Sequence, residues 1–288
     1  MNVNKPNIIA HKIKAGISRN PNIKNVIAIT SGKGGVGKST TAVNLAIALA
    51  KSGAKTGILD ADIYGPSLPI LLGEPDFKPE VSNNNFVPLD KFGIKSMSFG
   101  FLVDAKQPAI WRGAIVNKAI EQMFNDCEWG ELDYLIIDMP PGTGDIHLTI
   151  AQKMPLTATI VVTTPQDIAL LDVGKSIAMY SKLEIPCLGV IENMSTHICD
   201  NCGHESDIFG SGGSAKLQQE YGLELLAKLP LNLTIRQQSD SGNPIAAIPE
   251  NDLAQIYYAL ADKVNQQVAL LPKDFSSKLS SIAIVKEN

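Results

Sequence analysis

A glycine-rich segment, GKGGVGKS at residues 32–39, lies between an apolar run and a helical pattern. Residues 26–30 before it are apolar and β-branched, which is typical of a buried strand. Residues 39–51 after it repeat apolar side chains at helical spacing, and Gly53 is the residue type favoured just past a helix end. A strand joined to a helix through such a loop favours a parallel α/β sheet.

The same strand–loop–helix pattern recurs along the chain. Further elements are predicted as strands at 56–59, 134–137, 159–163 and 188–191, and as helices at 114–124, 146–153, 169–182 and about 251–270. Residues 86–101 alternate and contain Gly93, which predicts an inserted hairpin. The pattern predicts one doubly wound α/β domain over residues 25–270, a mostly parallel sheet with helices on both faces. Residues 1–24 are expected to form a flexible arm and residues 271–288 a weakly structured tail.

Composition excludes several classes of protein. The chain has 288 residues, of which 44% are hydrophobic and 19% charged, enough apolar material for a large core. Its net charge of −4 provides no basic field for nucleic acid, and no apolar run reaches the ~18–20 residues of a membrane helix. Residues 1–14 lack the apolar stretch of a signal peptide, and four cysteines are too few for a disulfide scaffold. We therefore expect a cytoplasmic protein that binds neither nucleic acid nor membrane.

The residue types of the segment suit phosphate binding, because they satisfy G-x-x-x-x-G-K-[ST]. Glycines let consecutive N–H groups turn toward phosphate oxygens without a Cβ in the way, and the following helix points its positive end at the same place. Lys38 is expected to reach the β- and γ-phosphates, and the Ser39 hydroxyl to ligate Mg²⁺. The residues predicted to bind the nucleotide here are Gly32, Lys33, Gly34, Gly35, Val36, Gly37, Lys38, Ser39 and Thr40.

Lys33 is a second lysine inside this loop. Because the loop backbone already wraps its own phosphates, the Lys33 side chain can project toward a nucleotide held by a second subunit. With Lys33 the segment resembles the deviant Walker A class of ATPases, whose pattern is K-G-G-x-x-K-[ST]. That class includes the nitrogenase iron protein and the MinD and ParA positioning ATPases. The resemblance implies ATP as substrate and nucleotide-dependent homodimers in which Lys33 contacts the partner's nucleotide.

Aspartates follow two of the predicted strands, at the sheet edge where ligands gather in open α/β folds. Asp60 and Asp62 follow the second strand, where one carboxylate can support the Mg²⁺ shell and the other can orient a water for in-line attack. The resemblance assigns the water to Asp62, and a helix cap at Asp60 with a turn at Asp62 is the alternative. Asp138 ends another apolar strand, the Walker B arrangement that holds Mg²⁺ directly or through water. Gly142 beyond it is expected to reach the γ-phosphate and to shift on hydrolysis.

Asn193 ends a later strand. Its amide carries both the donor and the acceptor that an adenine edge requires, and the resemblance favours this contact over the alternative, an Asx-turn at the strand end. His11 and His147 have no convergent partners in the sequence, so neither is assigned a role.

Cys199 and Cys202 form a C-x-x-C pair within residues 193–212, which follow the same strand. This spacing lets two thiolates bind one metal centre, and three interpretations are open. A redox dithiol is disfavoured, because it would normally lie at a helix N-terminus. A closed zinc site would add His197 and His204. The third interpretation uses symmetry: two such loops near the two-fold axis of a dimer supply four cysteines for one bridging iron–sulfur cluster.

Taken together, the motifs resemble the Mrp/ApbC iron–sulfur cluster carrier ATPases over roughly residues 24–270. The motifs that carry the resemblance are the phosphate loop, DADIYGPS at 60–67, DMPPG at 138–142, and the run from 192 to the cysteine pair. The resemblance implies a [4Fe–4S] cluster bound across a homodimer and transferred to apo-proteins with ATP hydrolysis. It also implies Mg²⁺ as cofactor and cluster scaffold proteins as partners. Many members carry a small domain ahead of the ATPase, and residues 1–24 are too short for it.

The alternative function is a positioning switch ATPase of the MinD or ParA kind with a structural zinc site. Such a protein is expected to carry a basic amphipathic C-terminal helix for membranes or a basic patch for DNA. Residues 271–288 contain three lysines without a sustained apolar face, which favours the cluster carrier. An electron donor like the nitrogenase iron protein is disfavoured, because the cluster cysteines of that protein lie far apart in sequence.

Overall fold

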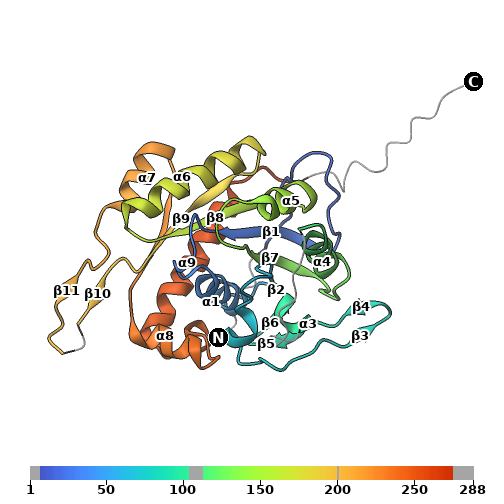
Figure 1. Ribbon diagram of the computed structural model, residues 1–288, viewed down its shortest axis with the longest axis horizontal. Coiled ribbons are helices and arrows are strands. Elements are labelled where there is room, and N and C mark those ends of the chain that lie inside the picture. The colour runs from blue at the N-terminus through green and yellow to red at the C-terminus, as the bar shows by residue number, and fades with distance from the viewer. Residues whose placement is uncertain (1–6, 104–112, 200, 275–288) are drawn as a thin grey trace, which may run out of the picture.

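The computed structural model describes residues 7–103, 113–199 and 201–274 (Figure 1). An eight-stranded sheet forms its centre, in the spatial order β12 (Leu225–Leu229), β9 (Cys187–Asn193), β8 (Ala158–Thr163), β1 (Ile23–Thr30), β7 (Leu132–Asp138), β2 (Thr56–Asp60), β6 (Ile94–Ser98) and β5 (Leu89–Lys91). Neighbouring strands pair in parallel except β5 with β6. The predicted doubly wound, mostly parallel sheet is confirmed. Residues 1–6 of the expected arm and 275–288 of the expected tail lie outside the described residues.

Helices cover both faces of this sheet (Figure 1). One face carries α1 (Lys38–Lys51), α8 (Leu233–Asp240) and α9 (Asp252–Ala269), and the other carries α4 (Gly113–Asn125), α5 (Asp145–Lys153), α6 (Asp167–Lys182) and α7 (Gly213–Tyr221). The short helices are α2 (Leu68–Leu71), α3 (Phe99–Leu102) and η1 (Ile245–Ala247). No helix within the described parts of the chain has the length and apolar character needed to cross a membrane.

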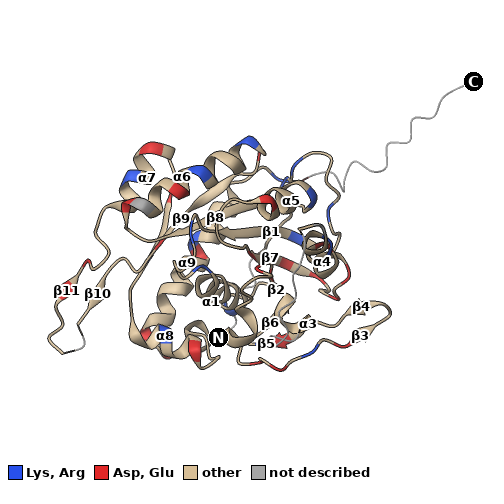
Figure 2. Cartoon of the chain, viewed as in Figure 1, with Lys and Arg blue, Asp and Glu red and all other residues tan. Residues whose placement is uncertain are grey.

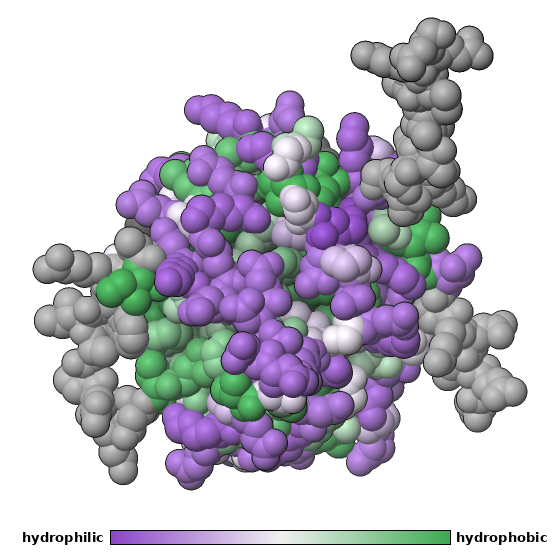
Figure 3. Space-filling model, turned by 90° about the vertical axis from the view of Figure 1, so that its right-hand side faces the viewer, coloured by the Kyte–Doolittle hydropathy of each residue, from purple (hydrophilic) through white to green (hydrophobic). Residues whose placement is uncertain are grey.

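The core explains why the central strands read as apolar runs. In β1 the residues from Val26 to Thr30 are all buried, because helices shield both faces of a parallel sheet. Helix α1 is buried from Thr41 to Leu49, since it packs against both the sheet and α9. The helix that follows the glycine-rich loop is therefore held on all sides. On the face shown in Figure 3, polar residues cover most of the surface and apolar residues gather in patches between them.

The region after β2 differs from the inserted hairpin expected over residues 86–101. Strands β5 and β6 do form an antiparallel hairpin, but β6 also pairs in parallel with β2 and so extends the central sheet. A separate ribbon precedes it, β3 (Val81–Ser82) paired with β4 (Asn85–Phe86). Its turn residues Asn83 and Asn84 have φ of 50° and 66°, the left-handed conformation that a two-residue hairpin turn requires.

Residues 7–22, expected as a flexible arm, contact the domain. Ile8 and His11 are buried, and backbone hydrogen bonds join residues 10–12 to residues 272–274 after α9. The two ends of the described chain therefore lie side by side. The boundary between arm and domain stays a prediction.

Candidate nucleotide and cysteine sites

The phosphate loop joins the carboxyl end of β1 to α1 in the middle of the sheet. It borders a cavity of about 290 Å³, whose lining residues come from the loop, from the segment after β2 and from the segment after β7. The lining residues are Ser31, Lys33, Gly34, Gly35, Gly37, Lys38, Ser39, Thr40, Asp62, Ser67, Leu71 and Pro141. The structure thus gathers at one cavity most of the loop residues predicted from the sequence, together with Asp62.

Two glycines of the loop are required by close contacts. Gly37 caps α1 with φ of 80°, and a Cβ there would lie 2.2 Å from the amide nitrogen of Asn193. A Cβ on Gly32 would lie 2.4 Å from the Cβ of Asp172 in α6. Both distances are shorter than any ordinary contact, so the loop is packed tightly between β9 and α6.

Lys38 and Asp138 form a buried ion pair inside the site. Lys38 Nζ lies 2.5 Å from Asp138 Oδ1 and 3.3 Å from Ser39 Oγ, and the two charged side chains are 7% and 0% exposed. The second carboxylate oxygen, Asp138 Oδ2, is buried and has no hydrogen-bond partner among the described residues. A buried carboxylate oxygen left open beside a serine hydroxyl is the kind of oxygen ligand set that Mg²⁺ takes. Asp138 and Ser39 therefore fit a magnesium ion.

Asp60 is held by a different set of contacts. Its Oδ1 accepts from Asp62 N at 3.0 Å, and its Oδ2 accepts from Ser67 N, Leu68 N and Ser98 Oγ at 3.2, 3.3 and 3.0 Å. Burial raises the pKa of Asp60, and the negative charge of neighbouring Asp138 raises it further. These bonds cap the start of α2, which supports the cap alternative, while the expected place of Asp60 in the Mg²⁺ shell stays a prediction.

Asp62 lines the same cavity as the phosphate loop. Its Oδ1 accepts a hydrogen bond from Gly65 N at 3.2 Å, and partial burial raises its pKa. A half-buried carboxylate at this position is able to accept a hydrogen bond from water. Its expected role in orienting the attacking water stays a prediction.

Lys33 is held within its own chain. Its Nζ lies 2.7 Å from Oε1 of Gln166, the residue that precedes α6. The expected contact with a partner's nucleotide would therefore require Lys33 to leave Gln166.

The segment after β7 is also bonded to the phosphate loop. Gly142 N donates to Ser31 O at 3.0 Å, so the N–H expected to reach a γ-phosphate has a partner inside the chain. The Asn193 amide also contacts the loop, because its Nδ2 donates to Val36 O at 2.8 Å. Contact between Asn193 and adenine stays a prediction.

Cys199 and Cys202 lie in a hairpin that projects from the body of the protein, between β10 (His197–Ile198) and β11 (Glu205–Ser206) (Figure 1). Two backbone hydrogen bonds close its tip, from Cys199 N to His204 O at 3.0 Å and from Gly203 N to Cys199 O at 2.8 Å. Cys199 is half-buried and Cys202 is exposed. The hairpin base is held by a bond from Leu231 N to Thr196 O at 2.8 Å. Below, residues 197–206 are called the cysteine hairpin.

The closed zinc site of two cysteines and two histidines, one of the three interpretations that the sequence left open, finds no support in the described residues. Among the residues with described positions, no three His, Cys, Asp or Glu side chains gather as a metal-binding group. His197 Nδ1 instead lies 3.2 Å from Leu231 O, at the hairpin base. Within one chain, the cysteine hairpin therefore presents a pair of thiols.

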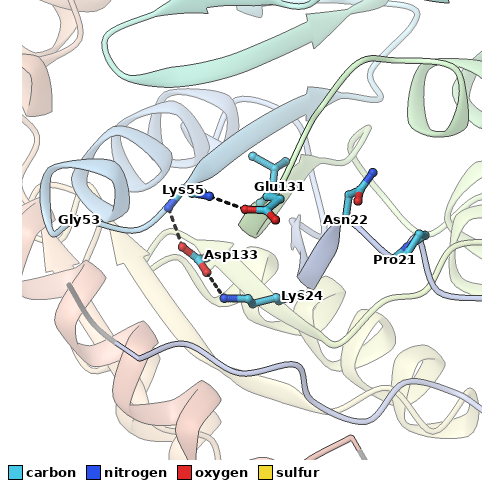
Figure 4. Close-up of a pocket in the computed structure, with 8 residues that line it drawn as sticks. Pro21, Asn22, Lys24, Gly53, Lys55, Glu131 and Asp133 are labelled. Carbon is cyan, nitrogen blue, oxygen red and sulfur yellow. Dashed lines mark hydrogen bonds and ion pairs between the residues drawn. The ribbon is translucent and has the colours of Figure 1, made fainter. Parts of the chain in front are cut away.

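Another hollow, of about 360 Å³, lies at the amino ends of β1 and β7 (Figure 4). Its charged side chains bind one another: Lys24 Nζ lies 2.7 Å from Asp133 Oδ1, and Lys55 Nζ lies 2.6 Å from Glu131 Oε2. Lysines and acidic residues are also interspersed on the helices above the sheet (Figure 2). Because the charges of this hollow are paired and it lies at the opposite sheet edge, it is not part of the candidate site.

Sequence reasoning missed three residues that position this site: Gln166, Ser98 and His147. His147 was given no partner, but its ring nitrogens lie 2.8 Å from Pro140 O and 3.0 Å from the Tyr180 hydroxyl. None of the three belongs to a local motif. The available signal was position, since Ser98 is the last residue of β6 and Gln166 follows the end of β8.

A glycine-rich loop between a central parallel strand and a buried helix, with an aspartate ending the adjacent strand, defines a P-loop nucleotide-binding protein. The chain belongs to the ParA family described as NUBPL iron-transfer P-loop NTPase, which matches residues 22–265. The resemblance predicted from the motifs is confirmed.

Curated relatives agree with this family. The chain is 52% identical over 257 residues to the iron-sulfur cluster carrier protein of Pseudomonas fragi, covering 88% of this chain and 90% of that protein. It is 52% identical over 248 residues to the iron-sulfur cluster carrier protein of Escherichia coli K12, covering 85% and 67%. It is 46% identical over 257 residues to the iron-sulfur cluster transfer protein NUBPL of Mus musculus, covering 87% and 80%.

Solved structures show the same fold. A nucleotide-binding protein of Archaeoglobus fulgidus, determined in complex with ADP, is 38% identical with a TM-score of 0.71 and covers 82% of this chain and 93% of that one. The cell division ATPase MinD of Pyrococcus furiosus is 21% identical with a TM-score of 0.62, covering 84% and 98%. The second likeness concerns the fold alone.

Proposed function

We propose that this protein is an ATP-hydrolysing carrier that binds a [4Fe–4S] cluster as cargo across a homodimer and transfers it to apo-proteins. One observation carries the proposal: a cavity that gathers most of the phosphate loop lies on the same sheet edge as a projecting hairpin with two thiols. The first site draws most of its predicted residues from one chain, whereas the second supplies half of the four ligands that such a cluster requires. The names of the relatives support iron–sulfur clusters as the cargo.

At the nucleotide site, Lys38 would leave Asp138 and bind the β- and γ-phosphates. Ser39 and the released Asp138 would hold Mg²⁺, which when bound neutralises charge on the phosphates. Asp62 would accept a hydrogen bond from the attacking water and orient it for in-line attack. Asp60 would hold the segment that carries Asp62, through its bond to Asp62 N.

Dimer formation would use Lys33 and the cysteine hairpin together. Lys33 would exchange Gln166 for the nucleotide of the second copy, which favours closure of two ATP-bound protomers face to face. A two-fold axis presents the same surface twice, so two hairpins near that axis would place two Cys199 and two Cys202 thiolates around one cluster. Apo iron–sulfur proteins would receive the cluster, and scaffold proteins would supply it.

Asn193 would link the two sites. Its side chain contacts Val36 and packs against Gly37, while its backbone ends β9, six residues before Cys199. Entry of a nucleotide that draws the Asn193 amide toward adenine would alter the strand end from which the hairpin departs. Hydrolysis and cluster transfer would then be coupled through one short segment.

The test is anaerobic reconstitution with iron and sulfide, with iron, sulfide and zinc measured per dimer beside the visible spectrum. Wild type is compared with the Cys199→Ala/Cys202→Ala double variant, and Cys187→Ala serves as a matched cysteine control in β9. We expect about four irons per dimer with broad absorption near ~400 nm, lost only in the double variant. Zinc alone, one per subunit and without a chromophore, would instead support a MinD-like or ParA-like positioning switch with a structural zinc site.

A further inference from the structure

His147 lies in the first turn of α5, immediately after the segment that links Asp138 to that helix. Its side chain is 1% exposed. Nε2 lies 2.8 Å from the carbonyl oxygen of Pro140, and Nδ1 lies 3.0 Å from the hydroxyl of Tyr180 in α6. The His147 and Tyr180 rings meet edge-on with centroids 6.4 Å apart. Both ring nitrogens are therefore used, one on each side of the imidazole.

The chemistry of these partners fixes the tautomer of His147. A carbonyl oxygen only accepts hydrogen bonds, so Nε2 carries the proton and donates it to Pro140. Burial lowers the pKa of His147 to about 4, so the ring is neutral near pH 7 and Nδ1 carries a lone pair. Tyr180, also buried, must then donate its hydroxyl proton to Nδ1. The two hydrogen bonds therefore run in one direction, because Tyr180 donates to His147 and His147 donates to Pro140.

Two hydrogen bonds hold the segment from Pro140 to Gly142, one beside the nucleotide cavity and one away from it. Gly142 N is bonded to Ser31 O, which lines the nucleotide cavity, so a phosphate entering that cavity competes for this N–H. The Pro140 carbonyl is bonded behind the segment to His147, which does not line the cavity. Two consecutive prolines, each with φ fixed by its ring, make the stretch between the two points stiff. One end can be released by nucleotide while the other stays anchored.

We infer that His147 is a positioning residue for ATP hydrolysis, which with Tyr180 fixes Pro140 as the pivot about which Gly142 turns from Ser31 to the γ-phosphate. The inference rests on the proposed hydrolysis of ATP. The anchored end lies two residues from Asp138, so the same hydrogen bond keeps that carboxylate in register while Gly142 moves. His147 contacts neither phosphate nor metal ligand and acts only through the backbone of Pro140.

The position of Tyr180 extends this role to α6. The same helix follows Gln166, which holds Lys33, and its Asp172 packs against Gly32 of the phosphate loop. The anchor of the moving segment is therefore built on the helix that packs against Gly32 and that begins directly after the residue bonded to Lys33. A shift of the segment and a release of Lys33 would both change contacts at α6 or at the residue that precedes it.

The test compares His147→Ala, His147→Gln and Tyr180→Phe in the full-length protein. His11→Ala is the matched control, because His11 is a second buried histidine, bonded to Asn25 and remote from the loop. We expect His147→Ala to lower kcat about tenfold with KM for ATP within about threefold, because the nucleotide is bound by other residues and only the geometry of the reacting state is lost. His147→Gln, whose amide can still donate to Pro140 O, should recover most of kcat. Tyr180→Phe should lower kcat by about two- to threefold.

Amide hydrogen exchange of residues 139–147 in the nucleotide-free protein is the second readout. Exchange should be faster in His147→Ala and close to wild type in His147→Gln. Wild-type kcat and unchanged exchange in His147→Ala would overturn the inference, as would equal losses in kcat for His147→Ala and His11→Ala. If wild type itself hydrolyses no ATP, the proposed function fails, and the exchange comparison alone decides whether His147 anchors the segment. If His147→Ala does not fold, the Gln and Phe variants carry the same comparison.

Discussion

The phosphate loop and the cysteine hairpin share one edge of the sheet but are built in opposite ways. Around the loop, Lys33, Lys38, Gly142 and Asn193 each have a hydrogen-bond partner elsewhere in the chain. The cysteine hairpin has a ladder of only two residue pairs and carries an exposed thiol near its tip. The loop lies between central strands, whereas the hairpin projects beyond them (Figure 1).

The difference shows where a single chain can complete a site and where it cannot. Parallel strands bring their carboxyl ends to one edge, so side chains distant in sequence converge on the loop without a partner. A hairpin outside the sheet lies away from these strand ends, and among the described residues its two cysteines are not joined by a third side chain of a metal-binding group. A second copy of the chain is the simplest source of the missing ligands.

The largest expected effect comes from Lys38→Ala, which removes the buried positive charge of the phosphate loop. Removal of Lys38 leaves Asp138 buried without a counter-charge, and breaking a buried pair costs roughly 3–5 kcal/mol of unfolding free energy. Loss of a charged hydrogen bond to phosphate should weaken nucleotide binding about 10- to 100-fold. Calorimetric titration with ADP and urea unfolding measure the two effects. Adding Asp138→Asn should restore stability but not binding, and equal ADP affinity in wild type and Lys38→Ala would contradict the assignment of Lys38.

Low pH should lower the unfolding free energy of the protein through His147. Its folded pKa is about 4 against an ordinary 6.5, so the neutral ring stabilises the fold above pH 6.5 and this contribution is lost as the pH falls toward 4. The difference of the two values corresponds to at most roughly 3 kcal/mol. Asp60, whose pKa is raised, works in the opposite sense: its contribution is present at low pH and lost as the pH rises through its folded pKa.

Because these two groups oppose each other, the measurement is the difference between wild type and His147→Gln. Urea unfolding of both proteins at pH 7 and pH 4.5 should show a larger acid loss in wild type. Parallel loss in the two proteins would mean that His147 is not held neutral in the fold.

A smaller effect is expected at Gln166, which tests whether the completed site restrains Lys33. The hydrogen bond from the charged Lys33 ammonium to the neutral Gln166 amide contributes about 1.5 kcal/mol, so Gln166→Ala should strengthen ATP-dependent dimerisation by up to about tenfold. Gln166→Glu should weaken it, because an ion pair holds Lys33 more firmly. Sedimentation at several protein concentrations measures the change. Lys33→Ala, expected to keep nucleotide affinity and lose turnover, should make both Gln166 variants indistinguishable.

The smallest effect is expected at the cysteine hairpin itself. Cys199→Ala/Cys202→Ala should change the unfolding free energy by less than about 0.5 kcal/mol, because neither side chain belongs to the core. In contrast, Gly37→Ala in the phosphate loop should lower the unfolding free energy by about 1–3 kcal/mol, since φ at Gly37 is 80° and an added Cβ would meet Asn193. Chemical unfolding of the cluster-free proteins compares them. A large loss from the cysteine substitutions would show that the thiols hold structure within one chain, against the two-region comparison.

The amino-acid pattern by itself determined the strand–loop–helix order, the phosphate loop and the C-x-x-C pair. These features are local: apolar β-branched runs, helical spacing and short motifs each depend on residues within about ten positions of one another. Boundaries moved by a few residues, as at β1, which begins at Ile23 rather than at residue 26. A hairpin was predicted over residues 86–101 and is observed at 89–98, but its parallel pairing with β2 was not predicted, since alternation does not specify which strand lies beside it.

Only the tertiary structure decided which groups hold the functional residues. Gln166 binds Lys33 across 133 positions, Asn193 binds Val36 across 157, and Tyr180 binds His147 across 33. These pairs meet because a parallel sheet aligns the ends of strands that are far apart in the chain. Local periodicity predicts that each strand is buried. The neighbour of each side chain depends on the order of the strands in the sheet, which local periodicity does not specify.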